Sequence, residues 1–478
     1  MKSATKYSCS SLSLPAVFAD GMVLQRERPV PVWGWAPPGA AVAVTLAGHS
    51  GQAQADGFGA WRAELPALPA GGPHILAVSA GSERICVENV LMGEVWFCSG
   101  QSNMNFSLQQ TDDAKAAIAA ADFPLIREFR TENTVSAIPQ EDCRGIWRVC
   151  TPAEAGNFSG VGYYFAREIH RELQVPVGLI NSSWGGTVIW PWIPHFGWAT
   201  VPETVDKATN GAAAEARARA EMKACLPNIR AWLERAESMN AMGRDIPALT
   251  GLPASASDLD SHIYNAMVAP LVEFPVRGAL WYQGESNVGN AVRYAYHMKA
   301  IINGWRQAWK QPDMPFFHVM LPPCEYAFNA TVLPEMWEAQ ASALALPHTG
   351  MAVTTDQGNP KDVHPARKRE VGRRLALLAL NRTYGRQDLA CSGPVYKSMK
   401  LEGSRVRIAL DHAGAGLRSR DGKPLDWFEV AGADGVFHPA QAEINGEAVI
   451  AWSPDVPAPQ MARFGWNHIA SPNLVNRE

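Results

Sequence analysis

The chain has 478 residues, of which 47% are hydrophobic and 18% charged, and its formal net charge is −4. This composition is typical of a folded globular protein and argues against a disordered chain or a nucleic-acid binder. No apolar run reaches the roughly 18 residues needed to span a bilayer, and residues 1–20 lack the continuous apolar segment of a signal peptide. We therefore expect no nucleic-acid and no membrane partner. The protein is expected to be cytoplasmic, or periplasmic or secreted if a signal peptide was removed.

Residues 14–88 consist of short alternating segments separated by Pro and Gly clusters. Such spacing is typical of an all-β sandwich. The expected strands are VPVWGW (30–35), AVAVTL (41–46), GAWRAEL (59–65) and HILAVSA (74–80). We predict a small N-terminal β-sandwich-like domain over residues 14–88.

Residues 89–386 alternate apolar strands with helical patterns, which predicts a parallel sheet with helices on its faces. The expected strands are EVWFCS (94–99), VGLINSSW (177–184), VRGALWYQ (276–283), FFHVML (316–321) and GMAVTT (350–355), and the expected helices include VGYYFAREIHREL (161–173) and ARKREVGRRLALLAL (366–380). An Ala-, Glu- and Arg-rich segment near 202–242 indicates a helical insertion. Ligands normally bind where the strands of such a sheet end.

Residues 387–478 return to short strands and turns, as in KLEGSRVRIALDH (400–412) and EINGEAVIAW (443–452). This change of pattern predicts a second β domain, at the C-terminal end. The whole chain is thus expected to be an α/β protein in three parts.

Ser102 lies in GQSNM, directly after the expected strand EVWFCS. A serine nucleophile commonly occupies such a strand-to-helix turn, but Met104 stands where the lipase motif G-x-S-x-G requires its second Gly. Ser and Asn are also favoured at helix N-termini. The motif alone therefore leaves a nucleophile and a helix cap as alternatives.

His364 lies in a polar loop before a strongly periodic helix, with Asp362 two residues earlier and Asp356 further back. An imidazole that acts as a general base is held in one tautomer by a carboxylate on its other ring nitrogen. His364 is therefore a candidate base, and Asp362 and Asp356 are the two candidate acids.

Two further expected strands end in small or polar residues. In SSWGGT (182–187), the paired glycines would let backbone N–H groups approach a developing oxyanion closely, and a tight turn is the alternative interpretation. In WYQGESN (281–287), an aromatic pair is followed by an amide and a carboxylate. The alternative there is a strand end with Gln283 hydrogen-bonded locally.

In chain order, GQSNM, SSWGGT, WYQGESN and DVHP resemble the four blocks of the SGNH-hydrolase superfamily. More closely, the chain resembles the sialate O-acetylesterase-like carbohydrate esterases, in LPAVFADGMVLQRERPVPVWGWAPPG, LMGEVWFCSGQSNM, YNAMVAPL, HPARKREVGRRLA and GPVYKS. The resemblance covers nearly the whole chain. It implies an α/β fold in which an SGNH-type three-layer α/β/α catalytic domain, residues 89–386, is flanked by the N-terminal β domain and by a C-terminal β domain, residues 387–478.

The resemblance also implies roles for individual residues. Ser102 would be the nucleophile and His364 the base, oriented by Asp362 or, alternatively, by Asp356; the spacing D-x-H departs from the superfamily's D-x-x-H. The implied oxyanion donors are the main-chain N–H groups of Ser102 and Gly185 and the amide of Gln283, which stands where the superfamily has Asn; Gly186 and Asn287 are alternatives. The implied reaction is hydrolysis of an O-acetyl ester on a carbohydrate. It needs no metal and no organic cofactor.

Side chains near these blocks are candidates for substrate binding, namely Trp184, Trp281, Tyr282, Glu285 and Asn287. Trp190 and Trp192 are further aromatic residues against which a sugar ring could stack. The predicted partner is an acetylated carbohydrate, as for a sialate O-acetylesterase. An acetyl esterase of plant cell-wall glycans such as xylan or xyloglucan is the alternative, and a non-catalytic carbohydrate-binding protein is a further one. A lipase or peptidase would share the chemistry, but the lipase elbow is missing.

Overall fold

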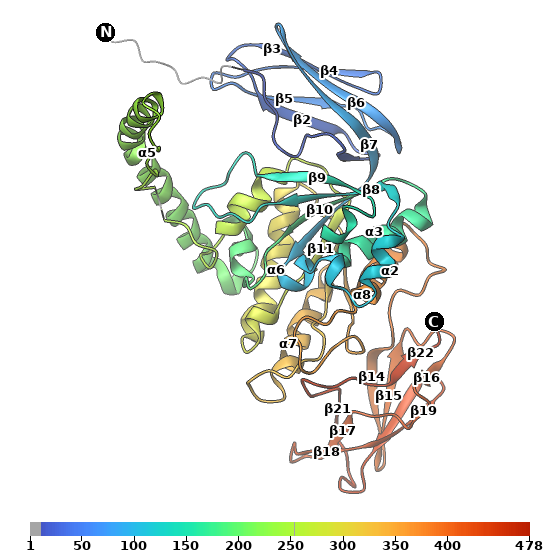
Figure 1. The fold of residues 1–478 in the computed structure, drawn as a ribbon. Helices are drawn as coiled ribbons and strands as arrows, with labels where there is room; N and C mark the ends of the chain where they lie inside the picture. Colours follow the sequence, from blue (N-terminus) through green and yellow to red (C-terminus); the bar gives the residue numbers. More distant parts are fainter. Residues whose placement is uncertain (1–10, 253) are drawn as a thin grey trace.

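The computed structural model describes residues 11–252 and 254–478 and shows a mixed α/β protein with a large central sheet of 11 strands (Figure 1). The main path of the sheet is β13-β12-β11-β7-β10-β8-β9, in which neighbours are parallel except for β8 and β9. These strands are β7 (Glu83–Gly100), β8 (Phe123–Thr131), β9 (Gly145–Cys150), β10 (Val177–Ser183), β11 (Gly278–Tyr282), β12 (Phe316–Val319) and β13 (Thr349–Ala352). Residues 1–10, half of the stretch assessed for a signal peptide, lie outside the described residues.

The inner strands are buried on both faces. Every residue of β10, β11 and β12 is buried, as expected where helices cover a parallel sheet on each side. The expected strands VGLINSSW, VRGALWYQ, FFHVML and GMAVTT are confirmed, each within a few residues of its predicted ends, whereas EVWFCS is the last part of the longer strand β7. These strands appear in the sequence as continuous apolar runs because neither of their faces is exposed to water.

Four longer helices accompany these strands: α3 (Gly160–Leu173), α6 (Ala291–Ala308), α7 (Val332–Ala341) and α8 (Lys368–Arg382). Helix α3 begins at Ser159, whose hydroxyl accepts the N–H of Gly162 at 3.1 Å and so caps the helix. Helix α3 contacts α8, and α6 contacts α7. The short helices are α1 (Ser102–Asn105), α2 (Ala114–Ala119) and α4 (His195–Trp198). Among the described helices, none is long and apolar enough to cross a membrane.

The N-terminal strands join the central sheet through β7. The first half of β7 pairs antiparallel with β6, whereas its second half pairs parallel with β10 and β11. The N-terminal strands are β1 (Val23–Gln25), β2 (Val30–Trp35), β3 (Ala41–Leu46), β4 (His49–Gln54), β5 (Ala60–Leu65) and β6 (Gly71–Ala80). The expected boundary between residues 88 and 89 therefore falls inside one continuous strand. Both sides of it contribute to the same hydrophobic core.

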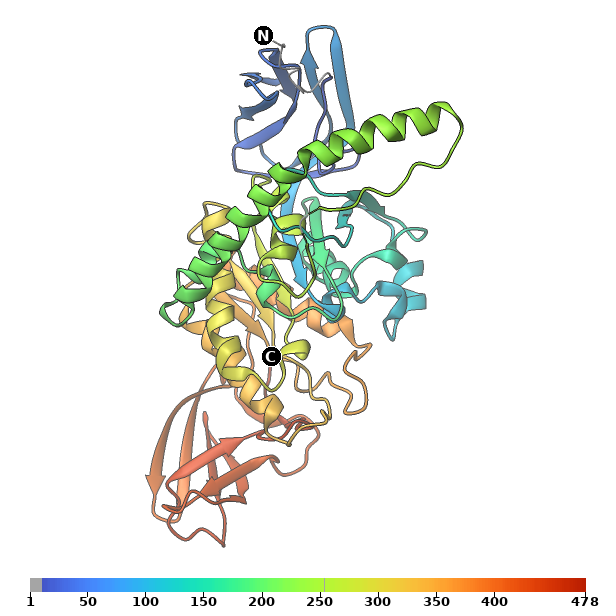
Figure 2. The ribbon, with the colours of Figure 1, turned by 90° about the vertical axis from the view of Figure 1, so that its left-hand side faces the viewer.

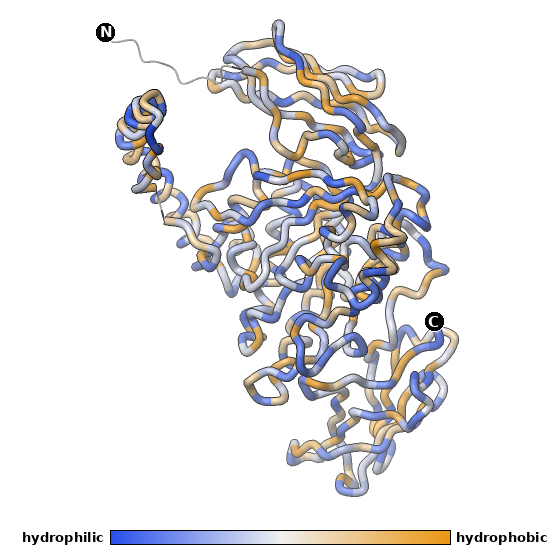
Figure 3. Tube along the Cα trace, viewed as in Figure 1, coloured by the Kyte–Doolittle hydropathy of each residue, from blue (hydrophilic) through white to orange (hydrophobic). Residues whose placement is uncertain are grey.

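Helix α5 (Val205–Ala241) occupies the segment where we expected a helical insertion. It has 37 residues, of which Ala218 and Ala236 are buried. Figure 2 shows it as a long helix that projects beyond the rest of the molecule, and Figure 3 shows hydrophilic and hydrophobic residues interspersed along it. Its exposure follows from this pattern, because a helix without an apolar stripe has no face to bury.

The C-terminal residues form strands with a core of their own, around Val406, Val430 and Val449. The strands form separate small sheets. They are β14 (Val395–Glu402), β15 (Arg405–Asp411), β16 (Leu417–Ser419), β17 (Phe428–Ala431), β18 (Phe437–Pro439), β19 (Gln441–Asn445), β20 (Ala448–Trp452), β21 (Met461–Phe464) and β22 (Leu474–Asn476). The segment KLEGSRVRIALDH contains the turn between β14 and β15, and the segment EINGEAVIAW contains the turn between β19 and β20, as their alternation predicted.

Candidate active site

The ends of three neighbouring strands meet at one level of the central sheet. Gly100 of β7 lies opposite Ser183 of β10 and opposite Tyr282 of β11. Gly100 has φ 135°, and a Cβ there would lie 2.0 Å from the carbonyl oxygen of Tyr282, so only glycine fits this approach. The loops that begin with Gln101, with Trp184 and after Tyr282 therefore start side by side, at the edge where ligands bind.

Ser102 and His364 are brought together at this edge. Ser102 is the first residue of α1, and His364 lies in the loop between β13 and α8. The Ser102 Oγ and the His364 Nε2 are 2.7 Å apart, and both side chains are partly buried. Burial, together with the charge of Lys368, lowers the pKa of His364. A neutral imidazole at hydrogen-bond distance can accept the proton of the serine hydroxyl.

Asp362 contacts the main chain of His364. Its Oδ1 accepts the backbone N–H of His364 at 2.8 Å, and the side chain is exposed. Across residues 11–252 and 254–478, the hydrogen bonds include none between this carboxylate and the imidazole ring. Asp362 thus holds the loop, and its charge acts to raise the pKa of the ring.

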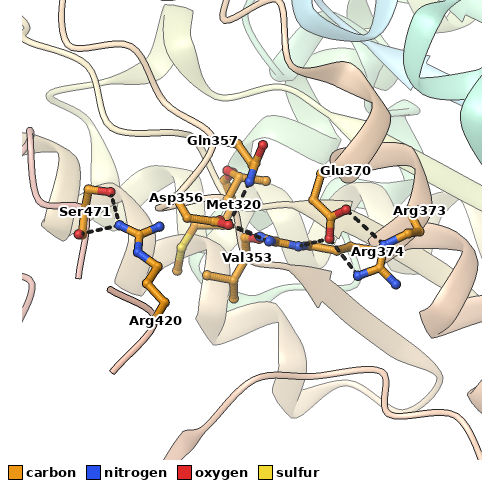
Figure 4. Close-up of polar contacts among 10 residues, drawn as sticks. Met320, Val353, Asp356, Gln357, Glu370, Arg373, Arg374, Arg420 and Ser471 are labelled. Atoms are coloured by element: carbon orange, nitrogen blue, oxygen red, sulfur yellow. Dashed lines mark hydrogen bonds and ion pairs between the residues drawn. The ribbon is translucent and has the colours of Figure 1, made fainter. Parts of the chain in front are cut away.

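Asp356 pairs with Arg374 of α8. The two carboxylate oxygens accept bonds of 2.6 Å from the two terminal nitrogens of Arg374, and Gln357 donates to one of them at 2.7 Å (Figure 4). Burial acts to raise the pKa of Asp356, but the hydrogen bonds and charge of Arg374 lower it overall. Asp356 therefore braces the loop after β13 against α8, and Figure 4 shows Glu370 and Arg373 extending this network.

Gly185 lies against Ser102. A Cβ on Gly185 would be 3.4 Å from the Ser102 Cβ, whereas Gly186 has φ 78° and nothing within 4 Å of its Cβ position. The main-chain N–H groups of Ser102 and Gly185 have no hydrogen-bond acceptor among the described residues. Two N–H groups without an acceptor beside a serine hydroxyl are candidate donors to an oxyanion.

Gln283 is fully buried, and its amide is committed elsewhere. Its Nε2 donates to the carbonyl oxygen of Thr187 at 3.2 Å and to the Oδ1 of Asn287 at 2.7 Å. The same Asn287 oxygen accepts the N–H of Ile189 at 3.1 Å. Both amide hydrogens of Gln283 are thus occupied, which corrects the prediction that they serve the oxyanion. Gln283 and Asn287 instead tie the loop after β10 to the loop after β11, and Asn287, being 3% exposed, offers little to a substrate.

The predicted aromatic platform is wrong for three of its members. Trp281 is 1% exposed, and Tyr282 and Trp192 are 0% exposed. The ring of Trp281 packs between those of Trp192 and Trp305, at 6.0 and 5.6 Å between centroids. Trp281 and Tyr282 belong to β11, an inner strand covered on both faces, so that its side chains are buried whichever face they point to. Trp184 and Trp190 remain partly exposed.

A polar network beside Ser102 joins Asn103 and Lys368, which the sequence analysis did not single out, to Glu285, which it predicted as a substrate-binding residue. The Asn103 amide donates to Glu285 and to the carbonyl oxygen of Val363, the latter at 2.9 Å, and the ammonium of Lys368 donates to the Asn103 Oδ1. Burial raises the pKa of Glu285 and lowers that of Lys368 to about 7. Glu285 is itself partly exposed, and through Asn103 it ties the loop after β11 to the loop that carries Ser102.

The network joins the segments that follow β7, β11 and β13. Asn103 follows the serine, Glu285 follows β11, and Lys368 begins the helix after His364. Gln101 adds to it, since its Oε1 accepts the N–H groups of Gly284 and Ser286, each at 3.3 Å. The only sequence signal for these residues was their position next to the motifs. Among the described residues there is no group of three or more His, Cys, Asp or Glu side chains placed to hold a metal ion.

Comparisons with known proteins identify the family of the chain. Residues 248–381 match the family described as carbohydrate esterase, sialic acid-specific acetylesterase. The sialate O-acetylesterase of Rattus norvegicus is 31% identical over 428 residues, which cover 80% of this chain and 75% of that protein, and the human one is 28% identical over 429 residues, which cover 80% and 73%. A crystal structure of a carbohydrate acetylesterase from Xanthomonas citri matches with a TM-score of 0.83 and 36% identity, covering 98% of this chain and 97% of the other. The chain therefore belongs to the sialate O-acetylesterase family of carbohydrate esterases.

Proposed function

We propose that Ser102 and His364 carry out the ester hydrolysis of this carbohydrate O-acetylesterase. The observation that carries the proposal is the 2.7 Å contact between the Ser102 Oγ and the His364 Nε2 at the ends of the central strands. Helix capping, the alternative role of Ser102, does not account for that contact. The side chain of Ser102 makes its hydrogen bond to a ring that is held at the site by a different loop.

In the first half of the reaction, Ser102 Oγ attacks the acetyl carbonyl carbon while its proton passes to His364 Nε2. The carbonyl oxygen becomes an oxyanion, which the main-chain N–H groups of Ser102 and Gly185 stabilise. The tetrahedral intermediate then expels the sugar oxygen, which takes the proton from His364. The products are a free sugar hydroxyl and an acetylated serine.

In the second half, His364 removes a proton from a water molecule as the water attacks the acetyl group. The second intermediate collapses, acetate leaves, and Ser102 regains its proton from the imidazole. The charge of Asp362 stabilises the imidazolium that forms in both halves, and the network of Asn103, Glu285 and Lys368 keeps the loops in register.

We further infer the three-layer α/β/α arrangement of SGNH hydrolases for the central part. On β7, Trp96 packs against Phe165 of α3 at 5.1 Å between ring centroids, whereas Phe97 packs against Trp305 of α6 at 5.2 Å. Consecutive residues of a strand point to opposite faces of the sheet. This supports helix layers on both faces, with the N-terminal and C-terminal strands as flanking β domains.

The substrate class follows from the relatives. The mammalian relatives are named sialate O-acetylesterases, and the Xanthomonas citri relative is described as a carbohydrate acetylesterase. We propose an acetylated sugar as the substrate, with acetylated sialic acid as the first candidate and acetylated xylan or xyloglucan as the second.

Two measurements test this function. Acetate release should be detectable from at least one of p-nitrophenyl acetate, acetylated sialic acid and acetylated xylo-oligosaccharides. An organophosphate should inactivate the protein and add its mass to the peptide that contains Ser102, and the exposed Ser404 serves as the internal control. Labelling elsewhere, or acetate release that survives complete labelling of Ser102, would refute the assignment.

A further inference from the structure

A pocket of about 450 Å³ lies outside the catalytic contact. Its walls come from three segments: the loop at Trp190, the beginning of α5 with Asp206 and Lys207 together with Glu203 just before it, and the first turns of α6 with Arg293, Tyr296 and His297. None of these residues takes part in the reaction described above. The pocket therefore needs an explanation of its own.

The pocket is a continuation of the catalytic edge. The loop that places Gly185 against Ser102 runs on to Trp190, and the loop that carries Asn287 runs on to α6. The two loops are bonded to one another, because the Asn287 Oδ1 accepts the N–H of Ile189 at 3.1 Å. The same pair of loops therefore leads from the surroundings of Ser102 to the pocket.

The charged groups around the pocket are mixed in sign. Lys207 is already paired with Asp260 at 3.1 Å, and its ammonium lies 5.0 Å from the ring centre of Trp198. The side chains of Arg293, Glu203 and Asp206, in contrast, make no ion pair or hydrogen bond within the part of the chain that the structure describes. One free cation and two free carboxylates do not make an anion site. They supply donors and acceptors for a ligand with many hydroxyl groups.

Aromatic rings and one imidazole complete the lining. Trp190 and Tyr296 are partly exposed, as is usual for rings that contact a ligand with both apolar and polar faces. His297 is 5% exposed, packs its ring against those of Trp198 and Trp190 at 5.0 and 6.3 Å, and has an Nδ1 without a hydrogen-bond partner in the described chain. Burial, with the charges of Lys207 and Arg293, lowers its pKa to about 4, so the ring is neutral and able to donate from one nitrogen and accept at the other.

We propose that this pocket is a second sugar subsite, which binds the residue of the glycan next to the one that carries the acetyl group. The proposal rests on the proposed function, since the subsite would bind another sugar of the same substrate. Stacking on Trp190 and Tyr296 with hydrogen bonds to Arg293, Glu203 and His297 would hold a hydroxylated ring without requiring it to be charged. The enzyme then prefers acetylated oligosaccharides to acetylated single sugars.

The kinetic test compares two matched pairs of substrates: acetylated xylose with acetylated xylotetraose, and acetylated sialic acid with acetylated sialyllactose. The wild-type protein should show a higher kcat/KM for the longer member of at least one pair. Arg293→Ala should remove one charge-assisted hydrogen bond and lower that value about tenfold, mainly through KM. Glu203→Gln should act in the same direction, and Arg217→Ala, an exposed arginine further along α5, is the matched control.

Equal kcat/KM values for long and short substrates in both pairs would overturn the subsite. An equal loss of kcat/KM for both members of a pair in Arg293→Ala would also overturn it. That result would mean that the arginine affects overall stability or the catalytic site. Thermal unfolding of each variant checks that the fold is retained.

Binding distinguishes failure of the subsite from failure of the proposed function. Unacetylated xylotetraose and sialyllactose are titrated calorimetrically into the wild type, Arg293→Ala and Arg217→Ala. Binding that is lost in Arg293→Ala alone supports the subsite even if no acetate is released. Absence of binding by both sugars, in a protein that hydrolyses acetylated single sugars, refutes the subsite and leaves the proposed function standing.

Discussion

The catalytic edge of the central sheet and the C-terminal strands use polar groups in opposite ways. At the catalytic edge, buried Asn103 and Gln283 bond to partners far away in the sequence, and the hydrophobic core around them is shared with the N-terminal strands. In the C-terminal part the core is small and separate, and the polar groups pair across neighbouring strands, as Arg463 and Glu429 do with exposed fractions of 29% and 26%. Buried groups cannot exchange their partners for water, whereas exposed groups can.

This difference predicts where a substitution has large consequences. Changes at the catalytic edge should alter rate, pH dependence or stability strongly, and equally conservative changes in the C-terminal part should do little.

The largest effect is expected for Ser102→Ala. Loss of a catalytic serine typically lowers kcat by on the order of a million-fold. The fold should persist because Ser102 is only partly buried and, among the described residues, its side chain bonds to His364 alone. Steady-state acetate release and a thermal melt measure the two quantities. If Ser102 were merely a helix cap, the variant would keep its turnover and lose about 1 kcal/mol of stability.

The largest loss of stability is expected at Glu94, inside β7, the strand that leads to Ser102. Its carboxylate is 0% exposed and accepts bonds of 2.6 Å from both Arg26 and Arg277. Glu94→Gln leaves the arginines without their anion, so we expect the free energy of unfolding to fall by about 3–5 kcal/mol, measured by urea titration.

Glu94 also predicts a pH dependence. Burial acts to raise the pKa of Glu94, but Arg277 and Arg26 lower it below 4.5 overall. Because the folded pKa is depressed, the stabilisation is present above the unfolded pKa and is lost as pH falls through the folded one. Wild-type stability should therefore decline below about pH 4.5, and Glu94→Gln should decline less. Parallel curves for the two proteins would contradict this account.

A change in pH profile is expected for Lys368→Met. Burial first, and the charge of Lys368 second, lower the pKa of His364, so that removing the charge should raise it. The acidic limb of the kcat/KM profile, which reports the base in the free enzyme, should move to higher pH. The exposed Lys361, on the loop that carries His364, offers a control. Lys361→Met should leave the acidic limb of the profile in place.

The opposite and smaller shift is expected for Asp362→Asn. The charge of Asp362 acts to raise the pKa of His364, and an asparagine oxygen can still accept the His364 backbone N–H. The acidic limb should move to lower pH, with a loss in kcat far below the ~10⁴-fold typical of a triad with the wrong tautomer. A loss of that size would instead show that Asp362 orients the imidazole ring during catalysis.

The smallest effect is expected in the C-terminal part. Arg463→Ala breaks the pair with Glu429, which is bidentate at 2.7 and 3.1 Å but partly exposed. We expect a change of about 0.2–1 kcal/mol in the free energy of unfolding and unchanged acetate release. A large loss of activity would show that the C-terminal strands act on the catalytic edge.

The sequence by itself determined the strands and the order of the chemical groups. Local alternation and apolar runs predicted β2, β10 and β11 closely, and the motifs singled out Ser102 and His364 before any contact between them was known. This succeeded because strand patterning and strand-end motifs depend on neighbours in the chain, which the sequence displays directly.

Only the tertiary structure decided which side chains are free to act. Trp281 and Gln283 both belong to the motif WYQGESN, in which site residues were predicted. In the structure, Trp281 packs between two tryptophans, and Gln283 donates both amide hydrogens to neighbouring loops. Lys368 showed no local sign of being buried beside Asn103, 265 residues away. Burial and hydrogen-bond partners arise from the packing of layers that are distant in sequence, and no local pattern records which of the possible partners is nearest.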